Sequence, residues 1–445
     1  MDFDFLLTTA WNRTDIQLAG AWADELERRG YRTAVFTPSE KEIPTENAEV
    51  FRLSSLVSRE SIDLRSIEQR YDIPSISQLS VTEREYFTLT EAETRRRIRR
   101  SVDALETLFE NHEFDYCLQE RGGEIHRLLA QYYTEHYGGT TIWRGFGFFD
   151  DSFSVSTHLR ELWDTYDIIE YDEIPDEGKE WTREYIEEFR NRRKHFTYGS
   201  TANNRIVALL DTIRDQVINR DQPGQVHRVG LNAAKRKLKG KLNKRICTSV
   251  SRSETFCEEE RYVFFPLQYR AESRLTVYAP EHYDQCWSAE YLARILPEGV
   301  TLCVKPHPHH PGEESPRWLY DLNQRSNVEV LHPDLHSHDA IRGAEAVVTI
   351  NNTAGVEALI FGKSVVNMGR AFYSHIPGVR RVTDLGSLPE VIAEAIDDEP
   401  TETDIVESVY SLRQTLHDAD RAKAEQKETR ATIDAVLDLI EQRAD

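Results

Sequence analysis

The chain has 445 residues, of which 39% are hydrophobic, 10% are aromatic and 30% are charged, and its formal net charge is −22. This length is enough for two or three globular domains, each with a substantial core. The acidic balance argues against general binding of nucleic acid, because neutralising phosphates requires clustered cations.

Arginine greatly outnumbers lysine among the cationic residues, and the lysines are clustered in one segment. There are 12 Lys beside 43 Arg, and five of the lysines fall between Lys235 and Lys244. An acidic, lysine-poor surface suits a salt-rich cytoplasm, so a halophilic source is one interpretation. The five Cys are scattered without a CxxC pair, which is typical of reduced thiols in a cytoplasmic protein. The sequence shows neither a signal-peptide pattern nor a run of about 20 apolar residues, so we expect a cytoplasmic protein.

Alternating strand and helix patterns fill residues 1–175. Apolar runs predict strands at residues 3–8, 32–36, 115–119 and 140–143. Periodic segments predict helices at residues 16–29, 82–112 and 125–136. Such alternation implies a mostly parallel sheet with right-handed crossovers, and we expect an N-terminal α/β domain here.

Residues 176–260 show no strand pattern, and we expect a helical and basic linker region. The segment 180–195 is charged on nearly all faces, as a solvated surface helix would be. The segment Lys235–Arg245 is strongly basic and allows two interpretations. It could contact an anionic membrane, where each cation contributes about 1 kcal/mol, or it could be a solvated interdomain linker.

The second α/β pattern, residues 261–400, is the clearer one. Strands are predicted at 262–268, 300–305, 328–331, 346–350 and 364–368, with helices between them. This pattern fits a doubly wound domain, whose ligands bind at the carboxyl ends of the strands. Residues 401–445 are predicted to be helical and to pack back on a domain through the apolar side chains Ile433, Val436, Leu437, Leu439 and Ile440.

One strand-loop-helix unit in this second block predicts a nucleotide site. The run 346–350 breaks at small and polar residues, and the next helix then starts at Asn352, Thr353, Ala354 and Gly355. A helix N-terminus offers amide groups and a partial positive charge to a phosphate. Glu357 lies one turn into this helix, at a spacing that suits hydrogen bonds to a ribose.

A second segment should reach the same edge of the sheet. Gln268 follows the first strand of this block, and Lys305, His307 and Pro308 close the next one. Prolines stiffen the turn around His307, which could then donate a hydrogen bond to a phosphate. Alone, His307 would most simply be a loop histidine. Its expected position beside Thr353 favours a functional role.

Other chemistries are weaker interpretations. His307, His309 and His310, with the nearby His332, His336 and His338, resemble metal ligands. No HExxH or carboxylate-paired pattern accompanies them, so we predict no metal. There is no P-loop pattern, and Gly145-Phe146-Gly147 lacks the third glycine and the helix of a dinucleotide fingerprint. We therefore expect neither an ATPase nor an NAD enzyme, and no cofactor.

The residues quoted above resemble the capsule-polysaccharide biosynthesis glycosyltransferases, which include relatives of capsular transferases that use CMP-activated Kdo. The resemblance is good over residues 262–389. In the N-terminal half of the chain it holds only for the general order of strands and helices. It is carried by 262–268, Lys305–Pro308, Thr353–Ala358, Gly362-Lys363 and Tyr373.

The resemblance implies a GT-B fold, in which two Rossmann-like doubly wound domains face a cleft, with a helical linker and a C-terminal helix. It places the donor in the C-terminal domain and implies no bound metal. His307 and Pro308 would match the His-Pro phosphate motif, Thr353 and Gly355 the second phosphate-binding element, and Glu357 the carboxylate near the ribose. CMP-linked acid sugars are implied as donors, although UDP- or GDP-sugars would fit the same residues.

A base that deprotonates the acceptor is expected in the N-terminal domain. Glu120, Glu124 and Asp150 each follow a predicted strand there. Each could equally be a structural or surface carboxylate, because the sequence shows neither its reach nor its ionisation.

These observations predict an enzyme that moves a sugar from a nucleotide-sugar to a surface polysaccharide or lipid-linked glycan. Two alternatives remain: a nucleotide-sugar 2-epimerase or hydrolase on the same scaffold, and a non-catalytic polysaccharide assembly protein. The expected partners are the nucleotide-sugar and the glycan or lipid-linked acceptor, without nucleic acid. Peripheral contact with the inner face of the membrane through Lys235–Arg245 would be consistent with this function.

Overall fold

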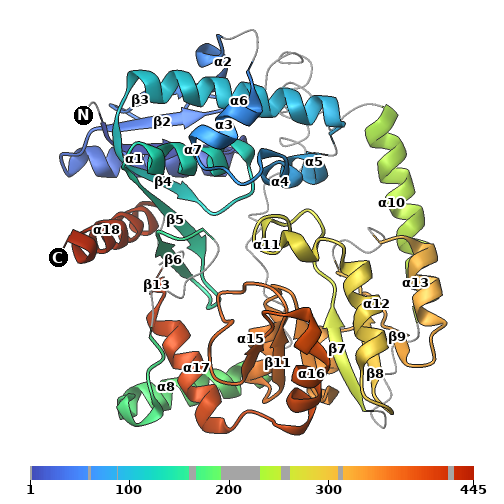
Figure 1. Ribbon diagram of the computed structural model, residues 1–445. Helices are drawn as coiled ribbons and strands as arrows, with labels where there is room; N and C mark the ends of the chain where they lie inside the picture. Colours follow the sequence, from blue (N-terminus) through green and yellow to red (C-terminus); the bar gives the residue numbers. More distant parts are fainter. Residues whose placement is uncertain are drawn as a thin grey trace. The chain divides into compact units, whose positions relative to one another are not determined.

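The computed structural model describes residues 3–58, 62–87, 89–159, 167–191, 231–251, 261–308, 314–418 and 425–444. The chain divides into two compact units, shown in Figure 1. The first unit contains the described residues of Met1–Leu162 and Thr415–Asp445. The second contains those of Trp163–Asn203 and Val229–Gln414.

The first unit is built round a seven-stranded sheet with the order β13-β6-β5-β4-β1-β2-β3. Five neighbouring strands, from β3 to β5, run parallel, while β6 and β13 add antiparallel strands at one edge. The strands are β1 (Phe3–Thr8), β2 (Thr33–Thr37), β3 (Glu49–Arg52), β4 (Phe114–Glu120), β5 (Thr140–Phe146), β6 (Ser152–Ser156) and β13 (His417–Asp418).

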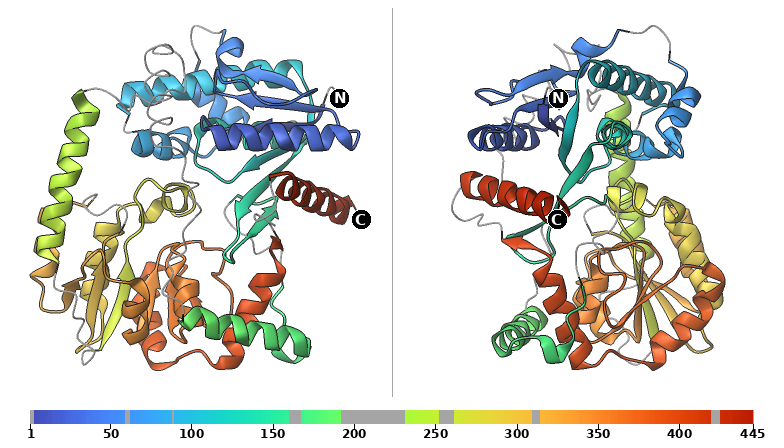
Figure 2. Two further views of the ribbon diagram at one scale, coloured as in Figure 1. Left: turned by 180° about the vertical axis from the view of Figure 1, so that it is seen from behind. Right: turned by 60° about the vertical axis from the view of Figure 1, so that its left-hand side comes forward.

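Helices cover both faces of this sheet (Figures 1 and 2). They are α1 (Arg13–Arg28), α2 (Leu53–Leu56), α3 (Leu64–Arg70), α4 (Ile76–Leu79), α5 (Val81–Phe87), α6 (Glu91–Asn111), α7 (Ile125–His136) and α18 (Glu425–Ala444). Polar side chains fix the helix starts: Asn12 caps α1, and Thr90 with Glu93 forms a capping box on α6. As expected, the C-terminal helix α18 packs back, burying Ile433 and Val436 against α1 and β6.

The second unit is built round a six-stranded parallel sheet with the order β12-β11-β10-β7-β8-β9. In chain order this is the 3-2-1-4-5-6 arrangement of dinucleotide-binding folds. The strands are β7 (Tyr262–Pro266), β8 (Thr301–Lys305), β9 (Val328–Val330), β10 (Ala346–Thr349), β11 (Ser364–Asn367) and β12 (Val379–Arg381). The short edge strand β12 was not expected from the sequence.

The helices of the second unit are α8 (Asp176–Asn191), α10 (Leu231–Val250), α11 (Ser273–Thr276), α12 (Gln285–Ile295), α13 (Pro316–Asn323), α14 (Ser337–Gly343), α15 (Ala354–Ile360), α16 (Leu388–Asp397) and α17 (Glu402–Gln414). The segment predicted as a solvated surface helix is α8 as far as Asn191, but one face of this helix is not solvated. Thr182, Ile186 and Phe189 are buried on one face, spaced about one and two turns apart. The last turn of α10 is also anchored, because Cys247 lies in the core of this unit.

Each sheet has a reversal point, where the chain turns from building one half of the sheet to building the other. In the first unit this point lies between β1 and β4, and in the second between β7 and β10. A glutamine bridges both. Thr8 Oγ1 donates to Gln119 Oε1 at 2.7 Å, and the Asn351 amide donates to Gln268 Oε1 at 3.1 Å. Ligands of such folds bind beside these points.

The prediction of two Rossmann-like doubly wound domains is confirmed. The compact units nevertheless differ in extent from the expected segments. The division assigns α8 and α10 to the second unit rather than to a separate linker, and α18 to the first. The reason is that α8 and α18 each bury an apolar face, and that α10 is anchored in the core of the second unit by Cys247 in its last turn.

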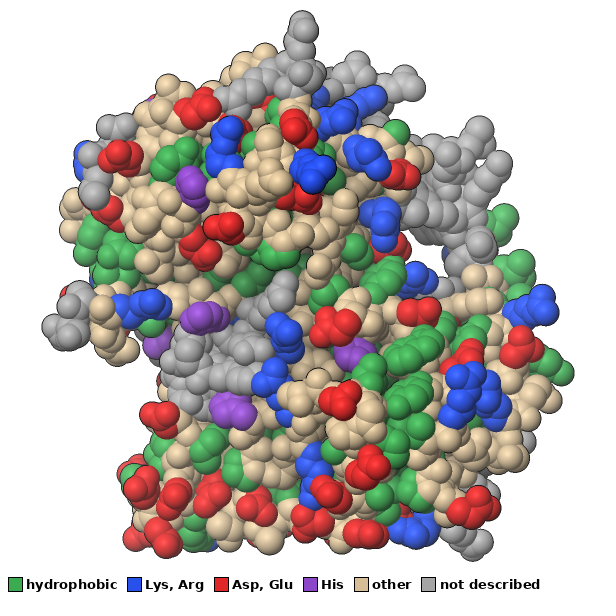
Figure 3. Space-filling model, viewed as in Figure 1, with side chains coloured by type: hydrophobic (Ala, Val, Ile, Leu, Met, Phe, Trp, Pro, Cys, Tyr) green, Lys and Arg blue, Asp and Glu red, His purple; other side chains and the backbone are tan. Residues whose placement is uncertain are grey.

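The surface is acidic, as the net charge of −22 requires. In the face drawn in Figure 3, carboxylates are widely spread and gather over α8 and α17 at the lower left. Among the helices that the structure describes, none has the length and apolar content needed to cross a bilayer.

Candidate functional site

An open cavity of about 110 Å³ lies at the carboxyl end of the second sheet. It brings together the two segments that the sequence analysis expected to meet. The residues lining it are Pro266, Leu267, Lys305, Pro306, His307, Pro308, Ser337, Asn352, Thr353, Ala354 and Glu357. Parallel strands end at a common edge, which is why loops distant in sequence converge there.

Lys305 is a buried cation at this cavity. It is the last residue of β8 and is only 2% exposed. Among the described residues, no group forms a hydrogen bond or a close ion pair with its ammonium group. Burial lowers the pKa of Lys305 to about 8, although the carboxylates of Asp334 and Glu357 partly oppose this shift. A buried and incompletely compensated cation is suited to bind an anion.

His307 lies two residues beyond Lys305, and Pro306 and Pro308 flank it on the same wall. The fixed backbone torsion of each proline limits how this loop can move. The ring of Tyr269, from the loop after β7, lies 6.5 Å from the His307 ring between centroids. His307 and Lys305 therefore offer two donors to one ligand from a stiff loop.

The turn before α15 forms the opposite wall. Two of the amides that the sequence predicted to be open to a phosphate are already hydrogen-bonded within this turn. The Asn352 side chain accepts from the Ala354 amide at 3.0 Å, and the Asn352 carbonyl accepts from the Gly355 amide at 3.1 Å. Asparagine side chains commonly compete for helix N-terminal amides in this way. The Thr353 amide has no partner among the described residues, so it remains available to a ligand.

Glu357 lines the cavity one turn into α15 and is 7% exposed. Its two carboxylate oxygens are held separately. Oε2 lies 3.3 Å from His338 Nε2, and Oε1 accepts from Thr353 Oγ1 at 3.4 Å. Such a fixed carboxylate can accept hydrogen bonds from hydroxyl groups of a ligand.

Two residues expected in the site, Gln268 and Gly355, do not line the cavity. They contact the segments that line it. Gln268 is 2% exposed and joins the ends of β7 and β10, as described above. Gly355 leaves room for Tyr373, because a Cβ there would lie 2.4 Å from the Tyr373 hydroxyl. That hydroxyl donates to the Asn352 carbonyl and so fixes the turn.

The carboxylates expected to act as a base lie in the first unit. Glu120, at the end of β4, pairs with Arg144 at 2.5 Å, and burial raises the pKa of Glu120 above its ordinary range. Arg144 is also paired with Glu428 of α18. Asp150 is exposed in the turn between β5 and β6. Glu124 occupies the N-cap position of α7 without a side-chain capping hydrogen bond, and its carboxylate lies 3.4 Å from Arg127.

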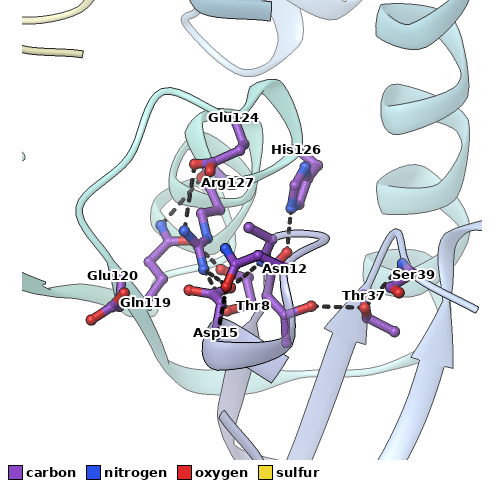
Figure 4. A network of polar contacts seen from close by, with 12 residues as sticks. Thr8, Asn12, Asp15, Thr37, Ser39, Gln119, Glu120, Glu124, His126 and Arg127 are labelled. Carbon is purple, nitrogen blue, oxygen red and sulfur yellow. Dashed lines mark hydrogen bonds and ion pairs between the residues drawn. The ribbon is translucent and has the colours of Figure 1, made fainter. Parts of the chain in front are cut away.

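A buried polar network beside the β1/β4 reversal point was missed by the sequence analysis (Figure 4). Its centre is Arg127, which pairs with Asp15 at 2.5 Å and reaches the Thr8 carbonyl at 3.4 Å. Next to it, His126 donates from Nε2 to the Thr9 carbonyl at 2.7 Å, and burial lowers the pKa of His126 to about 3. Applying the strand-end rule to β1 would have drawn attention to Asp15.

Four of the histidines considered as metal ligands, His307, His332, His336 and His338, lie in the described part of the chain. No group of three or more His, Cys, Asp or Glu side chains there is arranged to hold an ion. Instead, His332 and His336 accept backbone amides through Nδ1, from Asp334 and His338 respectively. His309 and His310 lie outside the described residues.

The family model described as "Capsule polysaccharide biosynthesis protein" matches residues 185–407. The chain belongs to this family. The match covers the whole sheet of the second unit, including both walls of the cavity.

Two curated proteins are similar over part of the chain. Protein FixF of Sinorhizobium fredii is 30% identical over 142 residues, which cover 30% of this chain and 32% of that protein. Capsule polysaccharide export protein KpsS of Escherichia coli is 32% identical over 125 residues, covering 26% and 31%. The chain thus spans about a third of the length of the curated relatives it matches.

Two solved structures are similar to this chain at low sequence identity and low TM-score. The beta Kdo 2,7 transferase part of Thermosulfurimonas dismutans KpsC is 14% identical, with a TM-score of 0.37, covering 76% of this chain and 89% of that one. WaaG, a glycosyltransferase of lipopolysaccharide biosynthesis, is 11% identical, with a TM-score of 0.33 and coverage of 96% and 99%.

Proposed function

We propose that this protein is a glycosyltransferase that moves a sugar from a nucleotide-sugar to a surface polysaccharide or lipid-linked glycan. The observation that carries the proposal is Lys305, a buried ammonium group that has no close anionic partner among the described residues and lines a cavity with His307 and Glu357. A nucleotide offers this set an anionic phosphate beside ribose hydroxyls. Membership of a capsule polysaccharide biosynthesis family supports a glycan as the product.

The proposed chemistry is a direct displacement. An acceptor oxygen bonds to the anomeric carbon while the bond from that carbon to the phosphate oxygen breaks, and the electron pair leaves with the nucleotide. Lys305 and His307 stabilise the leaving phosphate by charge and hydrogen bonding, and Glu357 holds the ribose. These residues supply positive charge from the protein itself, which is why we propose a metal-independent reaction.

The acceptor proton passes to a carboxylate that we assign to the first unit. Glu120 is the stronger candidate, because it lies at the end of a rigid strand and burial raises its pKa, which makes it more basic than an ordinary glutamate. Asp150 is the second candidate, and its turn is exposed.

We place the reaction in the cytoplasm. Cys117, Cys247, Cys286 and Cys303 are free thiols, in keeping with a reducing compartment.

A ligand panel tests this proposal. The protein is heated with CMP, UDP, GDP and their sugar conjugates, and its unfolding temperature is measured. We expect one nucleotide series to raise it, since a ligand at about a hundred times its Kd stabilises the folded state by roughly 2.7 kcal/mol. Sugar transfer to an added glycan is then measured with that donor. If no nucleotide stabilises the protein, the cavity has another role; rapid epimerisation or hydrolysis without acceptor would indicate the 2-epimerase or hydrolase alternative.

A further prediction separates the two base candidates. Replacing the base by its amide, as Glu120→Gln or Asp150→Asn, should lower the rate of transfer by about 10²- to 10⁴-fold. Donor binding should be unchanged, because neither residue lines the cavity of the second unit. We expect the loss in Glu120→Gln, measured as single-turnover transfer with donor affinity as the control. A fully active Glu120→Gln variant beside an inactive Asp150→Asn variant would move the assignment to Asp150.

A further inference from the structure

Helix α10 carries an unusual exposed ridge. Leu238, Leu242 and Ile246 are 71%, 56% and 38% exposed. Their spacing of four residues places them along one side of the helix. In the described part of the chain, the exposed large hydrophobic side chains elsewhere are all aromatic, so the exposed large aliphatic ones are confined to α10.

The same helix concentrates positive charge in an acidic protein. Residues 222–253 contain no Asp or Glu, and Lys235–Arg245 contains seven Lys and Arg in eleven positions. The side chains of Lys241, Lys244 and Arg245 are exposed. Lys241 and Arg245 follow Leu238 by three and seven positions, so they flank the ridge on the helix surface.

The ridge is presented from a fixed base. The final turns of α10 pack on α13, where Cys247 is fully buried in the core of the second unit and Val250 is partly buried. The Val250 carbonyl accepts from the Asn323 side chain at 3.3 Å. Figures 1 and 2 show α10 as one long helix that meets α13 at its C-terminal end and projects away from the sheet of the second unit.

We propose that α10 docks the second unit on an anionic membrane surface. An aliphatic ridge with flanking cations has the composition of helices that lie in the plane of a bilayer interface. The leucines enter the boundary between headgroups and acyl chains. The charged ends of the lysine and arginine side chains reach the lipid phosphates, while their alkyl parts stay beside the apolar region. The positive charge of α10 is the reason for choosing an anionic membrane as the partner. The rest of the protein surface is acidic and would be repelled by such a membrane. The proposal stands independently of the nucleotide site.

Vesicle co-sedimentation of the full chain tests it. Phosphatidylcholine vesicles are compared with vesicles that also contain anionic phosphatidylglycerol, each at low and high salt. We expect binding to the anionic vesicles only, weakening as salt rises. The variant Leu238→Ser/Leu242→Ser should lose about tenfold or more in affinity, since two buried leucines are removed from the apolar phase. The variant Lys241→Gln/Lys244→Gln/Arg245→Gln should lose the preference for anionic lipid.

Trp287→Ser is the matched control, because Trp287 is 45% exposed but lies on α12. It should bind vesicles as the unaltered chain does. Circular dichroism and thermal unfolding show that each variant is folded. Equal sedimentation with both kinds of vesicle overturns the proposal, and so does a ridge variant that binds as well as the unaltered chain. A ridge variant that changes only the oligomeric state would assign the ridge to a second copy instead.

Discussion

Lys305→Met should reduce nucleotide affinity by on the order of a hundredfold while leaving the protein folded. The change removes the positive charge and keeps most of the alkyl volume. Losing one partner of a buried charge pair typically costs about 2–5 kcal/mol of binding energy, and each 1.4 kcal/mol is about tenfold. The unliganded variant should be at least as stable as the unaltered chain, because it no longer buries an incompletely compensated ammonium group. Isothermal titration with the nucleotide found in the ligand panel measures the first effect, and thermal unfolding the second.

The pH dependence of the same binding gives an independent signature. The pKa of Lys305 is lowered to about 8, so the ammonium form predominates at pH 7 and is lost above pH 8. Nucleotide affinity should therefore fall as pH rises, by roughly thirtyfold between pH 7 and pH 9.5 if the bound phosphate keeps the lysine charged. The stability of the unliganded protein should depend on pH in the opposite direction from nucleotide affinity. Between the lowered pKa and the ordinary value the unfolded chain binds more protons, so this residue's contribution to stability grows as pH rises.

Lys363→Met is the control for both measurements. Lys363 pairs with Glu399 at 3.0 Å and does not line the cavity. Its loss should alter neither nucleotide affinity nor the slope of affinity against pH. Unchanged nucleotide binding by Lys305→Met would remove the central support for the proposed donor site.

Arg127→Met should destabilise the first unit by about 3–5 kcal/mol, the usual consequence of removing one member of a buried ion pair. Arg127 and Asp15 are 3% and 5% exposed in their side chains, and they lie 2.5 Å apart. Without the guanidinium, the Asp15 carboxylate keeps the Ala10 amide as its hydrogen-bond donor among the described residues. Urea unfolding followed by the fluorescence of Trp22 and Trp143, both fully buried in this unit, measures the loss.

A double variant and a surface control make the Arg127 result specific. In Asp15→Asn/Arg127→Met the remaining group is a neutral amide that still can accept from Ala10, so part of the stability should return. Arg95→Met breaks an exposed pair with Glu91 and should change little. If Arg127→Met unfolds like the unaltered chain, the network in Figure 4 does not stabilise this unit as its geometry indicates.

The elements of both sheets followed the sequence closely where the local signal was strong. The predicted strand 3–8 is β1, and the predicted helix 125–136 is α7. The first is rich in large apolar residues that are buried in the core, and the second repeats apolar residues at helical spacing. Strands β3, β6, β12 and β13 were not predicted. Each has only two to five residues, too few to show a clear periodic pattern.

The candidate site shows the same division. The sequence predicted that Lys305, His307 and Thr353 would share an edge, since each follows a strand of one parallel sheet. It did not predict that Asn352 would occupy the Ala354 amide, or that His338 would hold Glu357. Those contacts depend on side-chain directions, which local pattern does not specify.

The sequence by itself determined two α/β patterns, the acidic surface with one basic segment, and the strand ends at which polar residues gather. These follow from apolar periodicity and from composition, which are local properties of the chain. Only the tertiary structure decided that Lys305 is buried with no close anion among the residues that the structure describes. It also decided that Arg127 and Asp15 meet, and that α8 and α10 belong to the second unit and α18 to the first. The physical reason is that burial and charge pairing are set by neighbours from distant segments, and those neighbours exist only after the sheets have assembled.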